Sequence, residues 1–329
     1  MAVLITGGAG FIGANLARAL RTGAPMSGRP VPGLEPVDEV VVLDDLSTGD
    51  AANLAGVDVE LVQGSILDRD LLGALAARAD AVVHLAARPS VPRSIADPVA
   101  SHEANATGTL YVLEAARAAG NVPVVLASSS SVYGDTPVLP KHEGLPPRPR
   151  SPYAASKLAT ESYAIAYHHS YGLPVLALRF FNVFGPLQAA GHAYAAVVPA
   201  FVDAALAGRP LPLHGDGTQS RDFTFVDTVV AVLAAAALGP VSHDEPVNLA
   251  FGTRTDLNAL IAELGAVLGH DLAVERQPSR AGDVAHSQAE HSVLDGLFPD
   301  VEPVDLRTGL EATVAWFRTL APAVGVEDA

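Results

Sequence analysis

A tyrosine and a lysine stand four residues apart in the run Ser-Pro-Tyr-Ala-Ala-Ser-Lys, as Tyr153 and Lys157. Pro152 is typical of the first turn of a helix, and residues four apart lie on the same helical face. An ammonium group beside a phenol stabilises the phenolate and so lowers the pKa of the tyrosine. The pair predicts a general base near neutral pH, although a tyrosine and a lysine at this spacing also occur as surface residues.

A serine-rich segment at 128–131 precedes this pair and continues as Val-Tyr-Gly. It follows an apolar run that predicts a buried strand, and ligands bind at the carboxyl edge of parallel sheets. A serine hydroxyl at this edge can share a proton with Tyr153 and with a substrate hydroxyl. The alternative interpretation is a polar turn that is merely rich in serine.

Three glycines, Gly7, Gly10 and Gly13, follow the first apolar run with the spacing G-x-x-G-x-x-G. Glycines permit a tight turn and a close approach of backbone to a pyrophosphate, and the N-terminus of the next helix offers unpaired N–H groups. Glycines alone also occur in ordinary turns. The strand, turn and helix around these three predict a dinucleotide site.

Asp44 ends the second apolar run. A carboxylate there accepts hydrogen bonds from both ribose hydroxyls of an adenosine and repels a 2′-phosphate, which favours NAD over NADP. The alternative is that Asp44 and Asp45 are only turn carboxylates. Asp68, after the third run, either receives the adenine amino group or caps the next helix.

Alternating apolar and alanine-rich runs would position these residues. The pattern predicts parallel βαβ units in a doubly wound sheet. The expected strands lie at 3–6, 39–44, 60–63, 81–85, 122–128 and 175–180, with helices that begin near Phe11, Asp68, Ala104 and Tyr153. Residues 23–37, rich in proline and glycine, predict an inserted loop. Looser composition beyond about residue 185, with helices near 195–207 and 257–268, predicts a smaller second domain.

Composition excludes several classes of function. The chain has 329 residues, a formal charge of −16 and no cysteine, so disulfides, thiolate metal sites and a cysteine nucleophile are excluded. The charge disfavours nucleic acid and anionic membranes as partners, although a local basic site can still bind an anion. No signal peptide or long apolar span is found, which predicts a cytoplasmic protein. No metal site is predicted.

The motifs together resemble the extended short-chain dehydrogenase/reductase family, over nearly the whole chain, and within it the sequence is similar to the UDP-hexose 4-epimerases. The matching stretches lie at 6–13, 84–87, 130–134, 153–157, 179–186, 215–223 and 280–284. The resemblance implies a Rossmann-type domain at 1–184 that binds NAD and exchanges strands and helices with the C-terminal half. It also implies that residues 185–329 mainly bind a nucleotide sugar, and that the chain forms a homodimer through helices around 104–119 and 153–170.

The resemblance also implies roles for individual residues. Tyr153 is the base, Ser129 is its hydroxyl partner, and Lys157 binds the nicotinamide ribose. The implied cofactor site consists of Gly7, Gly10, Phe11, Ile12, Gly13, Asp44, Ile66, Asp68, Leu85, Ala86, Asn105, Tyr153 and Lys157. The implied substrate site consists of Ser90, Arg93, Ser129, Ser130, Asn182, Val198, Arg221, Arg280, Asp283 and Ser287.

Within the implied substrate site, Asn182, Arg221 and Arg280 contact the diphosphate and Asp283 holds the nucleoside ribose. Arginines also suit bidentate phosphate recognition on chemical grounds alone, although either one would more often form a surface ion pair. Ser287, four residues after the aspartate of Arg-x-Gly-Asp, lies against the 2-substituent of the sugar, and a small residue there is associated with acceptance of N-acetyl sugars.

The implied reaction is inversion at carbon 4 through a transient 4-keto sugar, on UDP-N-acetylglucosamine/UDP-N-acetylgalactosamine, UDP-glucose/UDP-galactose, or both. An alternative substrate is UDP-glucuronic acid, whose carboxylate Arg93 or Ser90 would bind. Dehydration is disfavoured, because the family's dehydratases carry an Asp-Glu pair where this chain has Ser130 and Ser131. A non-catalytic NAD sensor on the same fold would not need Ser129, Tyr153 and Lys157.

Overall fold

The computed structural model describes residues 1–190, 196–239, 241–278 and 284–320. Its centre is a seven-stranded sheet with the order β11-β6-β5-β4-β1-β2-β3, in which every neighbouring pair is parallel. The strands are β1 (Ala2–Thr6), β2 (Glu39–Asp44), β3 (Glu60–Gln63), β4 (Ala81–His84), β5 (Val124–Ser129), β6 (Val175–Phe180) and β11 (Val247–Leu249). The predicted doubly wound parallel sheet is confirmed.

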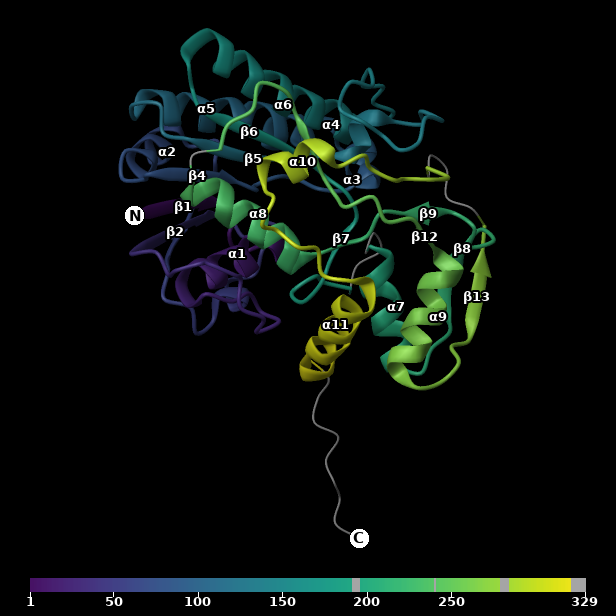
Figure 1. The fold of residues 1–329 in the computed structure, drawn as a ribbon. Helices are drawn as coiled ribbons and strands as arrows, with labels where there is room; N and C mark the ends of the chain where they lie inside the picture. The colour runs from purple at the N-terminus through teal and green to yellow at the C-terminus, as the bar shows by residue number, and fades with distance from the viewer. Residues whose placement is uncertain (191–195, 240, 279–283, 321–329) are drawn as a thin grey trace.

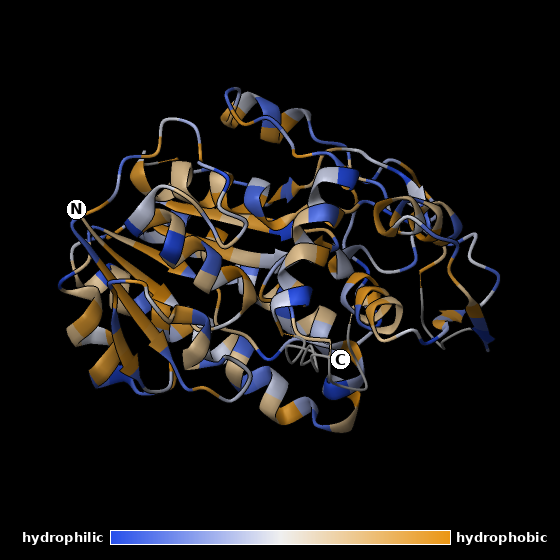
Figure 2. Cartoon of the chain, turned by 90° about the horizontal axis from the view of Figure 1, so that it is seen from below, coloured by the Kyte–Doolittle hydropathy of each residue, from blue (hydrophilic) through white to orange (hydrophobic). Residues whose placement is uncertain are grey.

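The inner strands of the sheet are largely apolar because both of its faces are covered, whereas β3 at the edge carries exposed Glu60 and Gln63. In β1, Val3 and Ile5 belong to one hydrophobic cluster, whereas Leu4 belongs to the cluster on the opposite face. Side chains alternate between the two faces of a strand, so a strand buried on both sides needs a continuous apolar run. Figure 2 shows these strands as apolar ribbons between helices of mixed polarity.

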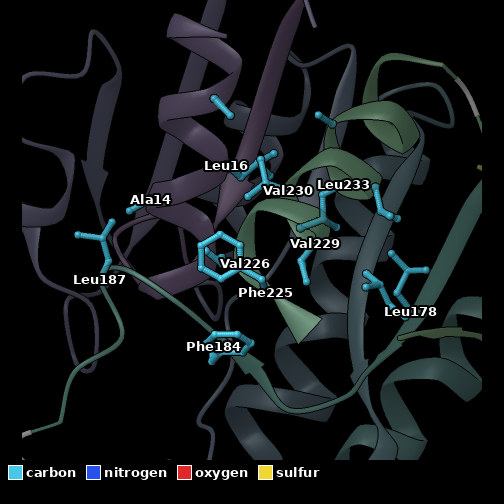
Figure 3. Close-up of a cluster of buried hydrophobic side chains, with 14 of the residues drawn as sticks. Ala14, Leu16, Leu178, Phe184, Leu187, Phe225, Val226, Val229, Val230 and Leu233 are labelled. Atoms are coloured by element: carbon cyan, nitrogen blue, oxygen red, sulfur yellow. The ribbon is translucent and has the colours of Figure 1, made fainter. Parts of the chain in front are cut away.

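Helices cover the two faces of the sheet (Figure 1). One face carries α1 (Phe11–Thr22) and α8 (Val226–Leu238), and the other carries α2 (Arg69–Ala76), α5 (Gly108–Ala118) and α6 (Pro152–Tyr171). Leu16 of α1 packs in one cluster with Val230 and Leu233 of α8 (Figure 3). Helix α1, which follows the first strand and its glycine turn, therefore packs against a helix that comes more than 200 residues later in the chain.

The N-terminus of α6 is fixed by local sequence. Ser151 Oγ accepts a hydrogen bond from Ala154 N at 3.1 Å, and Pro152 occupies the first turn, where its missing N–H costs nothing. At the other end Gly172 has φ 67° and closes the helix. This start places Tyr153 in the first turn, directly at the edge of the sheet.

The second half of the chain builds a smaller unit beside the sheet. Its helices are α7 (Val197–Leu206), α9 (Leu257–Leu268), α10 (Ser292–Leu297) and α11 (Leu306–Leu320). Its strand pairs are β7 (Val183–Phe184) with β10 (Thr224–Phe225), β8 (Leu211–His214) with β13 (Val274–Gln277), and β9 (Ser220–Arg221) with β12 (Thr255–Asp256). We propose a domain boundary near residue 184, with α8 and β11 returning to the sheet.

The structure differs from the sequence predictions at a few element ends. The fourth strand ends at His84 instead of residue 85, and the fifth spans 124–129 instead of 122–128. The helix expected near Ala104 is preceded by α3 (Val91–Ala96) and α4 (Pro98–His102), and a π-helical turn, Glu103–Thr107, leads into α5. Asp97 starts α4 by accepting a hydrogen bond from Ala100 N, a cap that the prediction overlooked.

Candidate functional site

A cleft of about 1970 Å³ runs along the carboxyl ends of the parallel strands. Its walls come from the residues that follow β1, β2, β3, β4, β5 and β6, and from α7 and α11 of the smaller unit. Ligand sites of doubly wound sheets occur at this edge because the loops there leave a crevice. Of the residues predicted for the cofactor, these line the cleft: Gly7, Gly10, Phe11, Ile12, Gly13, Asp44, Ile66, Leu85, Ala86, Tyr153 and Lys157.

The glycine turn leaves no room for side chains. Gly7 has φ 73°, and a Cβ on it would lie 2.5 Å from the backbone N of Ala86. A Cβ on Gly13 would lie 2.4 Å from the carbonyl oxygen of Gly7. Helix α1 starts just after Gly10 without any side-chain cap, so its first N–H groups are available to an anion. The turn therefore fits the pyrophosphate of a dinucleotide.

Asp44 closes the far end of this cofactor half of the cleft. Its carboxylate is buried and accepts hydrogen bonds from Ala9 N and Leu46 N, both at 2.9 Å. A Cβ on Gly49 would lie 3.0 Å from both carboxylate oxygens, so the loop that follows β2 wraps tightly around it. This fixed carboxylate fits a ribose diol. Asp68 caps α2 by accepting a hydrogen bond from Leu71 N at 3.1 Å, and its contact with adenine stays a prediction.

Tyr153, Ser129 and Lys157 meet at the floor of the cleft. Ser129 ends β5 and lies close enough to Tyr153 for its hydroxyl to stabilise the phenolate. Lys157, one turn further along α6, donates from Nζ to Ala127 O at 2.8 Å. The end of β5 thus aligns a hydroxyl, a phenol and an ammonium group at a single edge of the sheet.

Burial decides the protonation of these groups. It raises the pKa of Tyr153, and the hydrogen bond with Ser129 offsets only part of that rise. The expected lowering of the Tyr153 pKa by Lys157 was therefore wrong for the protein alone, since desolvation of the phenolate outweighs the favourable interactions. Burial also lowers the pKa of Lys157 to about 8. At neutral pH the free protein carries a neutral phenol and an ammonium group.

Asn105 contributes to the site by fixing backbone. Its Oδ1 accepts from Arg88 N at 2.7 Å, and its Nδ2 donates to Ser156 Oγ at 2.9 Å. Ser156 Oγ in turn donates to Tyr153 O at 2.8 Å. Asn105 therefore ties the loop after β4 to the first turn of α6, which carries the phenol.

His84 is a structural residue that the sequence predictions did not assign. Its two ring nitrogens are 2.7 Å from Thr6 Oγ1 and 2.9 Å from Thr109 Oγ1. Burial, and to a smaller extent Lys157, lower its pKa to about 3, so the ring is neutral. The bonds link β1, β4 and α5 behind the glycine turn. The motif His-Leu-Ala-Ala pointed to this position, but only the fold identifies its partners.

The predicted substrate residues divide into two groups. Ser90 and Arg93 line the cleft with Ser129, and Ser90, at φ 98°, caps α3. The predicted residues that the structure describes but does not place in the cleft wall are Ser130, Asn182, Val198, Arg221 and Ser287, and Asp68 and Asn105 of the cofactor set are also outside it. Arg280 and Asp283 lie outside the described residues.

Among the predicted substrate residues outside the cleft wall, two lie side by side on neighbouring segments. Arg221 is in β9, where its Nη1 donates to Ser220 O at 2.9 Å. Ser287, which is buried, donates from its backbone N to the same carbonyl at 3.0 Å. Asn182 has φ 29° and donates from Nδ2 to Asp222 O at 3.3 Å. These contacts are compatible with a substrate wall on the smaller unit, which stays a prediction.

Neither a metal centre nor a membrane-spanning helix is found in the described residues. No group of three or more His, Cys, Asp or Glu side chains there is arranged to hold a metal ion. No described helix is both long and apolar enough to cross a membrane.

Comparisons with known proteins agree on one family. The model of the NAD dependent epimerase/dehydratase family matches residues 3–250. The chain is 38% identical over 324 residues to a UDP-glucose 4-epimerase of Mycolicibacterium smegmatis, covering 97% of this chain and 99% of that protein. Its structure resembles a UDP-N-acetylglucosamine 4-epimerase from Methanobrevibacter ruminantium M1 in complex with UDP-N-acetylmuramic acid, with TM-score 0.88, 34% identity and coverage of 97% and 99%. It also resembles a dTDP-glucose 4,6-dehydratase from Streptomyces venezuelae with NAD bound, with TM-score 0.85, 36% identity and 97% coverage of each chain.

Proposed function

The chain belongs to the NAD-dependent epimerase/dehydratase family, and on this premise we propose that it is a 4-epimerase of a UDP-sugar. The proposed substrates are UDP-N-acetylglucosamine/UDP-N-acetylgalactosamine, UDP-glucose/UDP-galactose, or both. The observation that carries the proposal is the position of Tyr153, Ser129 and buried Lys157 together in the cleft wall, with Lys157 one helical turn from Tyr153. Proton transfer to and from a sugar hydroxyl needs such a phenol with a hydroxyl relay beside it.

In this reaction Tyr153 and Ser129 remove the proton of the 4-hydroxyl group and later return it. NAD held by the glycine turn and Asp44 would supply the hydride transfer at carbon 4 that no side chain offers. We expect the positive charge of Lys157, one helical turn from Tyr153 on α6, to favour the phenolate once the cofactor is bound. Asn105 and Ser156 keep the first turn of α6, and therefore the phenol, in place.

Inversion requires that the 4-keto sugar presents both faces, so the diphosphate must be held while the hexose turns. We propose that Asn182, Arg221 and Arg280 bind the diphosphate and that Asp283 binds the nucleoside ribose. These four residues come later in the sequence than the cofactor residues, which suits separate binding of the nucleotide and of the cofactor. The smaller unit binds the nucleotide and leaves the sugar against the sheet edge.

Dehydration is the reaction of several similar proteins, and the serine segment argues against it here. Elimination needs an acid and a base near carbons 5 and 6, whereas this chain has Ser130 and Ser131 where the family's dehydratases carry Asp-Glu. Ser131 Oγ is buried and has no hydrogen-bond partner among the described residues. UDP-glucuronic acid is a second candidate substrate, since Arg93 and Ser90 line the cleft and can bind its carboxylate.

We also propose a homodimer in the cytoplasm. Large apolar side chains are exposed next to α6: Ile95 and Val99 are each 65% exposed, and Tyr163 on α6 itself is 42% exposed. Exposed apolar side chains that gather on neighbouring helices are typical of a subunit interface.

The test of the proposed function is a product assay. The purified protein is incubated separately with UDP-glucose, UDP-N-acetylglucosamine and UDP-glucuronic acid, and the products are followed by proton NMR. We expect the 4-epimer from at least one of the first two, without added reductant. Formation of a 4-keto-6-deoxy sugar would show a dehydratase, and turnover of UDP-glucuronic acid alone would move the activity to the second candidate.

A substitution at Ser287 tests the proposed sugar pocket. Ser287 is only 6% exposed, so a tyrosine there has to displace neighbouring atoms, which a packed wall resists. We expect Ser287→Tyr to abolish turnover of UDP-N-acetylglucosamine while turnover of UDP-glucose, where the wild type has it, survives. Ser287→Ala is the matched control, and it should retain both activities. Unchanged N-acetyl turnover in the tyrosine variant would remove Ser287 from the pocket.

A further inference from the structure

A charged pair is buried between helix α6 and the sheet. Glu161 of α6 is 2% exposed and Arg179 of β6 is 3% exposed. The guanidinium donates from Nε to Glu161 Oε2 at 3.0 Å and from Nη2 to Oε1 at 2.7 Å. The reaction proposed above uses neither side chain, so the pair needs another explanation.

Stability alone does not explain this pair. Burying two charges carries a desolvation penalty that often exceeds their attraction, and apolar residues of similar volume frequently stabilise a fold as well or better. The guanidinium of Arg179 also leaves Nη1 buried without a hydrogen-bond partner among the described residues. What such a pair offers over apolar packing is direction, because its hydrogen bonds form in only one arrangement of the partners.

The carboxylate of Glu161 lies across two paired strands. Ser128 of β5 and Arg179 of β6 are opposite each other in the parallel register. Ser128 Oγ donates to Glu161 Oε2 at 2.9 Å, in addition to the two bonds from Arg179. One side chain of α6 is thereby fixed to two neighbouring strands at the same level along them.

The same face of α6 carries the proposed base. Tyr153, Lys157 and Glu161 follow one another at intervals of four residues, which places them along one helical face. Lys157 Nζ donates to Ala127 O at 2.8 Å. Glu161 meets Ser128, the next residue of β5. A shift or rotation of α6 that breaks the Glu161 contacts therefore also moves Lys157 and Tyr153.

Apolar packing would hold this helix only loosely. The side chains that α6 buries are small or polar, without a large aliphatic residue among them. They are Ala154, Ser156, Lys157, Thr160, Glu161, Ala164 and Tyr167. Because apolar contacts are non-directional, such a face leaves a helix free to slide or turn on a sheet. The polar side chains must therefore set the position of α6, and Glu161 binds both β5 and β6.

We propose that Glu161, held by Arg179 and Ser128, is a positioning residue that fixes the rotation and height of α6 over the end of β5. This inference rests on the proposed function, because what it fixes is the place of Tyr153 and Lys157 against the reacting sugar. Glu161 is not part of the cleft wall, so it acts only through those two residues. The effect is large because a displacement of about 1 Å can lower a rate by about 10²-fold.

The test removes the whole set of bonds at once. In the triple variant Ser128→Ala/Glu161→Met/Arg179→Met, no charge or hydroxyl group of the set is left buried without its partner. The protein should therefore unfold at a temperature close to that of the wild type. We expect kcat to fall by about 10- to 100-fold, whereas calorimetry with UDP should give wild-type affinity. This split between kcat and affinity separates misplacement of the base from a general loosening of the fold.

Tyr167→Phe is the matched control. Tyr167 lies on the same helix and donates to Glu114 of α5, so the variant removes a bond of α6 that reaches neither β5 nor β6. It should keep the kcat and the UDP affinity of the wild type.

The ammonium group of Lys157 reports the position of α6 without any turnover. The chain has two lysines, Lys141 and Lys157, so ¹³C-lysine labelling gives two side-chain signals, and a Lys157→Met sample assigns them. In the wild type the Lys157 signal should titrate near pH 8, because burial lowers its pKa to about 8. The triple variant loses one positive and one negative charge together, so a displaced helix with water at the ammonium group should raise this pKa toward 10.5. In Tyr167→Phe it should stay near 8.

The outcomes distinguish this inference from the proposed function. A wild-type protein that epimerises a UDP-sugar, together with a triple variant that has normal kcat or an unchanged Lys157 titration, would overturn the positioning role alone. Parallel losses of kcat, UDP affinity and unfolding temperature would show that the pair only holds the fold together. A wild-type protein without epimerase activity, whose Lys157 pKa nevertheless rises in the triple variant, would overturn the proposed function and leave the placement of α6 by Glu161 standing. An unchanged Lys157 titration in an inactive protein would overturn both.

Discussion

Replacing Tyr153 by phenylalanine should lower kcat by about 10²–10⁴-fold, the range typical of a lost general acid–base group. The phenol hydroxyl interacts with Ser129, whereas the ring only fills space in the first turn of α6. The variant should therefore keep its fold and its affinity for UDP. Single-turnover assays with a UDP-sugar, together with calorimetry using UDP, measure the two properties separately.

Tyr163→Phe provides the control for this experiment, because Tyr163 lies on the same helix and is 42% exposed. Its kcat should equal that of the wild type. A Tyr153→Phe variant with a nearly normal rate would mean that another group moves the proton. A variant that loses UDP binding in parallel with kcat would instead indicate that the ring shapes the substrate site.

Much of the fold could be predicted because it depends on local patterns. Apolar runs such as that of β2 read as buried strands, and Pro152 and Gly172 mark the two ends of α6 through their own backbone preferences. The short helices before Ala104 were missed because a six-residue helix such as α3 has too few turns to show a period. The return of β11 to the sheet could be expected only from the resemblance, since a three-residue strand carries almost no pattern.

The candidate site was predictable where chemistry and spacing coincide, as for Gly7, Gly13, Tyr153 and Lys157. The protonation states of these side chains were not predictable, because they depend on how deeply each group is buried. The spacing of Tyr153 and Lys157 suggests a lowered tyrosine pKa, whereas the packed cleft floor raises it.

Replacing Lys157 by methionine should lower kcat strongly and move the remaining activity to higher pH. In the wild type an ammonium group lies one helical turn from the phenol, and its loss removes a positive charge that favours the phenolate. The pH midpoint of kcat should rise by at least about one unit, and the rate near neutral pH should fall by about 10²-fold or more. An unchanged pH profile in Lys157→Met would remove Lys157 from control of the base.

The same substitution should make the protein more stable near neutral pH. Burial lowers the pKa of Lys157 from 10.5 in the unfolded chain to about 8, so below pH 8 the folded state holds an ammonium group that it disfavours. Between these values the unfolded state binds more protons, and the free energy of unfolding therefore rises with pH across this window. Lys157→Met should exceed the wild type by up to about 3 kcal/mol near pH 7, with the difference shrinking toward pH 10.5. Urea unfolding of both proteins across this range measures it. A variant that is less stable than the wild type by the same amount at every pH would show that the bond from Lys157 to Ala127 O stabilises the fold, and that Lys157 is a structural residue as well as a catalytic one.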